Sequence, residues 1–84
     1  MVFPSTNQYT IRYRSNGRTG KTALIVEDSA GTAYLFSGGS LQGQMHGNDA
    51  SRRLASRMAR TATWRPVPRV APYTIDGLRQ VTKV

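Results

Sequence analysis

Two apolar runs separated by a short polar stretch dominate the pattern of hydrophobic and polar positions. Residues 21–28 read Lys-Thr-Ala-Leu-Ile-Val-Glu-Asp and residues 32–37 read Thr-Ala-Tyr-Leu-Phe-Ser, so both runs are rich in β-branched and aromatic side chains. The stretch between them, Asp-Ser-Ala-Gly at 28–31, suits a type I turn with Gly31 as the left-handed residue of a three-residue loop. The pattern predicts a central antiparallel hairpin. Its expected pairs are Val26 with Tyr34, Leu24 with Phe36, Ile25 with Leu35 and Glu27 with Ala33.

A first strand is predicted upstream of this hairpin. Tyr9 to Arg14 alternates apolar and polar residues, which is typical of a half-buried strand. Asn16-Gly17 follows and favours a two-residue turn, because both turn positions need positive φ. Such a turn pairs Tyr9 with Leu24 and Ile11 with Thr22. The meander then has a bulky apolar face made of Tyr9, Ile11, Tyr13, Leu24, Val26, Tyr34 and Phe36, with Arg12, Arg14 and Lys21 on the opposite face.

An amphipathic helix is predicted from Ala50 to about Thr63, capped by Asn48 or Asp49. At about 100° per residue, four arginines fall in one arc of about 140°. The apolar residues occupy the other side, which we expect to pack on the bulky face of the sheet. We call the first group the arginine face, and it consists of Arg52, Arg53, Arg57 and Arg60.

The remaining segments contain many glycines and prolines. Residues 37–47 form either a flexible connector or a short irregular strand around Leu41 and Met45. The prolines of residues 64–72 favour extended chain, with Trp64 either anchored on the core or stacked on a base. In residues 73–81, Asp76-Gly77 indicates a hairpin while the apolar residues keep a helix-like spacing, and we favour a short extended or hairpin element.

The sequence therefore predicts a single α+β domain over residues 1–84. Its expected parts are an irregular lead-in over 1–8, a three-stranded antiparallel β-meander, one amphipathic helix packed on one face, and an extended, proline-containing C-terminal arm over 64–84.

Composition adds a strong charge signal. The chain has 84 residues and a net charge of +8, and ten of its twelve cationic residues are arginine. Such a field attracts polyanions, and arginine adds planar, bidentate recognition of phosphate. A surface charge that only keeps the protein in solution is the simpler alternative.

Several classes of function are disfavoured by the same composition. Cysteine is absent, and one histidine and four acids are few potential metal ligands, so no metal or cofactor is expected. No apolar run approaches the roughly 20 residues of a membrane span, and the N-terminus lacks the features of a signal peptide. We expect a cytoplasmic protein without membrane contact. Residues 17–22, Gly-Arg-Thr-Gly-Lys-Thr, resemble part of a P-loop, but Ser15 stands where that motif needs glycine and a strand follows instead of a helix.

Three functions are compatible with these observations. The first is nucleic-acid binding without catalysis, in which the arginine face is continued by Arg65 and Arg69. Cations of the first hairpin are further candidates, although the predicted packing places them on the opposite side of the sheet; they are Arg12, Arg14, Arg18 and Lys21. The second is an interaction or structural subunit that forms a homodimer or docks an acidic partner through an open apolar face, with Ile25 and Leu35 as its interface. The third, an enzyme, is the weakest, because no acid pair, triad or metal cluster can be assembled.

Overall fold

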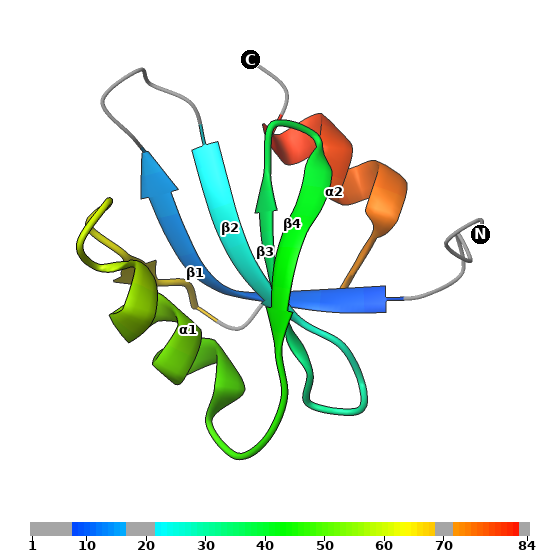
Figure 1. The fold of residues 1–84 in the computed structure, drawn as a ribbon. Helices are drawn as coiled ribbons and strands as arrows, with labels where there is room; N and C mark the ends of the chain where they lie inside the picture. Colours follow the sequence, from blue (N-terminus) through cyan, green and yellow to red (C-terminus); the bar gives the residue numbers. More distant parts are fainter. Residues whose placement is uncertain (1–7, 17–21, 69–71, 83–84) are drawn as a thin grey trace.

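The computed structural model describes residues 8–16, 22–68 and 72–82, which form an α+β fold with an antiparallel sheet (Figure 1). Within these residues the sheet has six strands instead of the predicted three, and there are two helices instead of one. The strand order is β4-β3-β2-β1-β5, with β6 also paired to β1. The elements are β1 (Gln8–Asn16), β2 (Thr22–Glu27), β3 (Ala33–Ser37), β4 (Ser40–Met45), α1 (Ala50–Met58), β5 (Arg65–Pro66), β6 (Tyr73–Thr74) and α2 (Ile75–Thr82).

The central hairpin of β2 and β3 is confirmed, including its register. All four predicted pairs between residues 24–27 and 33–36 are present. Gly31 has a φ of 84°, and its N–H donates to the Asp28 carbonyl oxygen at 3.1 Å. The Asp28 carboxylate also accepts hydrogen bonds from the N–H groups of Ala30 and Thr32, each at 3.0 Å. The turn is therefore held by local chemistry, which is why a local pattern was enough to predict it.

The pairing of β1 with β2 is confirmed, but the predicted register is wrong. Ile11 lies opposite Val26 and Tyr13 lies opposite Ile25, so Arg12 is the extra residue of a β-bulge. The bulge moves Tyr13 to the face that carries Ile25. Asn16 pairs with Thr22, which rules out the two-residue turn. Gly17, Arg18 and Lys21, and with them the P-loop-like stretch up to residue 21, lie outside the described residues, as does the lead-in up to residue 7.

The helix α1 covers the opposite sheet face from the one predicted, and it ends at Met58, before the predicted boundary. It packs Ala50, Leu54 and Ala55 against Ile25 and Ala33, with Leu35 half-buried beside them. The face that we expected to be open is thus covered, and Ile25 is completely buried. The homodimer through Ile25 and Leu35 loses the observation that motivated it and stays a prediction.

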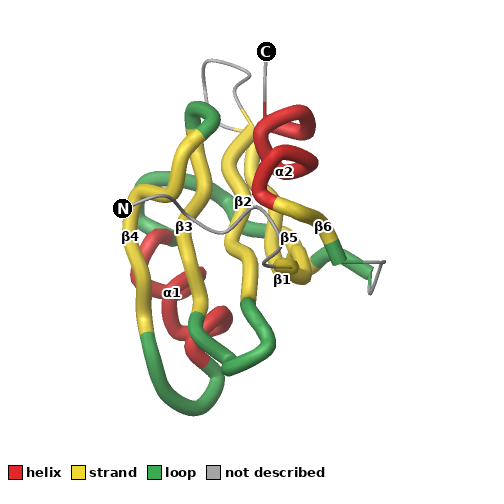
Figure 2. Tube along the Cα trace, turned by 90° about the vertical axis from the view of Figure 1, so that its right-hand side faces the viewer, coloured by secondary structure: helices red, strands yellow, loops and turns green. Residues whose placement is uncertain are grey.

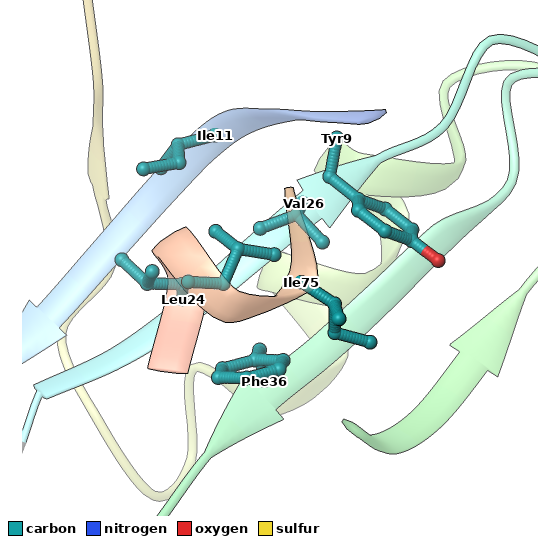
Figure 3. Packing of buried hydrophobic residues seen from close by; sticks show 7 residues of the cluster. Tyr9, Ile11, Leu24, Val26, Phe36 and Ile75 are labelled. Atoms are coloured by element: carbon teal, nitrogen blue, oxygen red, sulfur yellow. The ribbon is translucent and has the colours of Figure 1, made fainter. Parts of the chain in front are cut away.

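The bulky face is covered by a second helix, α2, which corrects the extended or hairpin prediction for residues 73–81. The helix-like spacing of Ile75, Leu78 and Val81 is the part of the sequence pattern that agrees with the observed helix. The Thr74 hydroxyl accepts a hydrogen bond from the Gly77 N–H at 3.1 Å, as N-cap side chains do. Figure 3 shows Ile75 in the buried cluster formed by Tyr9, Ile11, Leu24, Val26 and Phe36.

The two helices lie on opposite sides of the sheet, and the strands form the layer between them (Figures 1 and 2). The C-terminal arm is partly extended, as predicted, and it continues the sheet. β5 pairs with the second half of β1 and β6 with its first half. The Val67 N–H donates to the Arg12 carbonyl oxygen at 2.9 Å. Residues 37–47 contain strand β4, with an irregular register against β3, so the irregular-strand alternative is the one observed.

Tyr34 provides a prediction for alkaline pH. Burial, together with the hydrogen bond that its hydroxyl donates to Asp28 Oδ2 at 3.0 Å, raises the pKa of Tyr34 to about 12. Because the folded state holds the phenol neutral, this contribution to stability is complete below pH of about 10, the ordinary tyrosine value, and is lost as the pH rises to about 12. We expect the Tyr34→Phe variant to lose one late-titrating tyrosine in an absorbance titration at high pH. A titration unchanged by the substitution would contradict this assignment.

Candidate nucleic-acid interface

The arginine face is positioned by the amphipathic pattern of α1. Its apolar residues are buried against the sheet, while Arg52, Arg53 and Arg57 are exposed on the outer side. Arg60 is also exposed, in the turn that follows the end of the helix. The structure thus exposes all four predicted arginines, three of them on α1 as the sequence indicated, whereas Arg60 lies beyond the end of the helix.

The beginning of α1 differs from the prediction. Asp49 occupies the N-cap position in a left-handed conformation, with φ of 55°, and its side chain makes no capping hydrogen bond. Its carboxylate instead lies 3.4 Å from Nη2 of Arg52. Arg53 Nη1 donates to the His46 carbonyl oxygen at 3.3 Å. The Arg52–Asp49 pair is exposed and contributes little to stability, so Arg52 can exchange this partner for a phosphate at low cost.

Arg57 and Arg60 stand apart from these contacts. Neither forms an ion pair with any acid in the described residues. Arg57 also follows Arg53 by one helical turn, and like charges at this spacing on a helix repel each other, which an anion placed between them relieves. The C-terminal half of the arginine face therefore has the stronger electrostatic preference for an anion.

Arg12 lies on the α1 side of the sheet because α1 covers the face that carries Ile25 instead of the bulky face. Arg12 and Arg52 line one hollow of about 600 Å³ between the start of α1 and the 28–31 turn. Arg12 Nε lies 3.9 Å from Oε2 of Glu27, and the Ser51 hydroxyl donates to that same oxygen at 2.5 Å. Two carboxylates, those of Glu27 and Asp49, also line the hollow, so its charge is mixed. Arg12 is thus a neighbour of the arginine face, contrary to the predicted packing, but it already has an acidic partner.

Arg14 and Arg65 are brought together where β5 pairs with β1, on the opposite face of the sheet from α1. They are direct partners in the β1–β5 ladder. They line a second hollow of about 640 Å³, together with Asn16, Thr63 and the residues 66–68. Sequence reasoning named both arginines, but it did not identify Asn16 or Thr63 or the pairing itself. No local signal marks this pairing, because β1 and β5 are far apart in the chain.

Thr63 and Trp64 lie between these two groups of cations. Thr63 lines the Arg14–Arg65 hollow and also a smaller hollow of about 370 Å³, which Tyr13, Arg52 and Trp64 share. Trp64 is half-buried against the cluster under α1, as expected of an anchor. Arg69, the remaining candidate contact of the C-terminal arm, lies outside the described residues.

Comparison with known proteins assigns no relative. No protein-family model, curated protein or solved structure matches this chain significantly. Neither of the two described helices is long and apolar enough to cross a membrane.

Proposed function

We propose that this protein is a small, non-catalytic nucleic-acid-binding protein that contacts phosphates mainly through the arginine face of α1. The observation that carries the proposal is the exposure of Arg52, Arg53 and Arg57 on the outer side of α1 and of Arg60 in the turn that follows, with Asp49 as the acid paired to this face. A net charge of +8 on 84 residues adds a long-range attraction for any polyanion.

Little sequence preference is expected from such a surface. Contacts to phosphate set position and affinity, whereas sequence is read through contacts to base edges. Arginine guanidinium groups on an exposed helix bind phosphate oxygens of any sequence, often with two parallel hydrogen bonds. We therefore propose an affinity that depends on charge and salt much more than on the order of bases.

The main alternative is an interaction subunit that docks an acidic protein on the same arginines. Because α1 covers the sheet face that carries Ile25 and Leu35, the open apolar face no longer supports this alternative. The arginine face itself would serve either polyanion, so the two functions are distinguished by the ligand that binds.

The test is the binding of labelled oligonucleotides of unrelated sequence to protein freed of co-purifying nucleic acid. We expect every oligonucleotide to bind at low salt, with affinities within a few-fold of one another. The matched control is Arg79→Ala, which removes one exposed arginine from α2 on the other side of the sheet, where it pairs with Asp76 at 3.4 Å. This control should bind nearly as tightly as the unmodified protein. Absence of binding at low salt would refute the proposal.

A further inference from the structure

Arg14 and Arg65 are two like charges that lie side by side without an acidic partner among the described residues. Their Cα atoms are partners in an antiparallel ladder, so both side chains leave the sheet on the same face. Arg14 is also the partner of Leu24 in the β1–β2 ladder, which identifies this face as the one that α2 covers further along the sheet. Like charges placed directly opposite each other across a ladder destabilise it.

The described residues around the pair provide no negative charge. The seven residues that line this hollow of about 640 Å³ include no aspartate or glutamate. Both arginines are exposed, and neither forms an ion pair with an acid among the described residues. This hollow differs in that respect from the hollow at Arg12, where Glu27 and Asp49 balance the cations.

Other hydrogen-bond donors line the same hollow. Asn16 is two residues beyond Arg14 on β1 and therefore faces the same side. The Asn16 side-chain oxygen accepts a hydrogen bond from the Thr22 hydroxyl at 3.4 Å, which leaves its NH₂ group as a donor. Thr63 adds a hydroxyl at the rim. Two guanidinium groups, an amide NH₂ and a hydroxyl form a donor set that suits a tetrahedral oxyanion.

We propose that the Arg14–Arg65 hollow is a discrete binding site for one phosphate group, held by both guanidinium groups and assisted by Asn16. The bound group neutralises the repulsion across the β1–β5 ladder, so binding and the docking of the C-terminal arm stabilise each other. A phosphate of a nucleic-acid backbone or a free phosphate ester can supply the group. Binding of a nucleic-acid backbone here rests on the proposed function, whereas the phosphate site itself does not.

Thermal unfolding in inorganic phosphate tests the site. We expect the melting temperature to rise at low phosphate concentration and then to keep rising logarithmically, by about 6 to 11 °C at ten times the dissociation constant for a domain of this size. We call this the site-specific rise. Phosphate also stabilises proteins without a site, but that effect is small at low concentration and grows in proportion to the concentration.

The Arg65→Gln variant makes the test specific, because the proposal predicts effects of opposite sign. Without phosphate, the variant should melt at a higher temperature than the unmodified protein, since the like-charge pair is gone. In phosphate, it should lose the site-specific rise. The control Arg79→Gln, outside the hollow, should keep that rise. A variant that melts lower without phosphate, or that keeps the site-specific rise, would overturn the proposal. Arg14→Gln provides a second variant with the same expectations.

Oligonucleotide binding then assigns the source of the phosphate. If the backbone occupies the site, Arg65→Gln should reduce the log–log salt slope by about 1. If the slope is unchanged while the phosphate effect is lost, the natural ligand is a small phosphate ester. Phosphate stabilisation without any oligonucleotide binding would support the site and refute the proposed function. Oligonucleotide binding without the site-specific rise in phosphate would do the reverse.

Discussion

Replacing Leu78 with alanine should destabilise the protein by about 2 to 5 kcal/mol, the range for truncating a buried leucine. Leu78 is completely buried on α2, in the cluster that includes Leu24 and Phe36. A domain of this size has a total stability of only about 5 to 15 kcal/mol, so the loss is a large fraction of it. The melting temperature should fall by at least about 8 °C. Thermal and urea unfolding followed by circular dichroism measure both quantities.

The control for this experiment lies on the same helix. Gln80 is exposed, so Gln80→Ala should change stability by less than about 0.5 kcal/mol. Equal effects of the two substitutions, or a negligible effect of Leu78→Ala, would mean that α2 does not cover the bulky face of the sheet.

Replacing both Arg53 and Arg57 with alanine should weaken oligonucleotide binding by about 60-fold at 0.1 M salt. Each phosphate contact contributes a slope of about 0.9 in log affinity against log salt, which is about eightfold per contact at 0.1 M relative to 1 M. Removing two contacts multiplies these factors. The loss should be similar for every sequence, because the contacts are to phosphates. Fluorescence anisotropy with labelled oligonucleotides provides the dissociation constants.

This double variant should remain folded. Both side chains are exposed and point away from the buried residues of α1, and the substitutions remove a surface hydrogen bond, the one that Arg53 donates to the His46 carbonyl oxygen. The melting temperature of the variant therefore serves as the control for structure, and Arg79→Ala serves as the control for charge. A loss of binding accompanied by unfolding would not be evidence that the arginine face binds the oligonucleotide. A folded double variant that binds as tightly as the unmodified protein would contradict its assignment.

The parts of the fold predicted correctly are those determined by local chemistry. The β2–β3 hairpin follows from the Asp28-to-Gly31 turn, whose hydrogen bonds form within five residues. The exposed and buried sides of α1 follow from helical periodicity alone. Both predictions needed no knowledge of the rest of the chain.

The parts predicted wrongly depend on contacts between distant segments. The bulge at Arg12 changes which face Tyr13 occupies, and the alternating pattern of β1 looks the same with or without it. Asp76-Gly77 is a turn signal in isolation. A helix nevertheless forms, because the helical spacing of Ile75 and Leu78 lets both side chains pack on the buried face of the sheet. Once α2 occupies the bulky face, α1 is left with the face that carries Ile25.

The same distinction between local and long-range contacts applies to the candidate site. Most of the arginine face was predictable because one helix carries three of its four residues. The Arg14–Arg65 pair was not, because it exists only when the C-terminal arm pairs with the first strand. Within the described residues, the predicted cations form two groups, one on the α1 side of the sheet and one at the β1–β5 edge.

A salt titration of oligonucleotide binding tests the central claim, that the arginine face binds nucleic-acid phosphates, most directly. For duplex DNA and about four phosphates engaged, the log–log slope of affinity against salt should be about −3 to −4. In the Arg53→Ala/Arg57→Ala variant, the slope should become less steep by about 2. A slope near zero, or the same slope in the unmodified protein and the folded double variant, would contradict the claim.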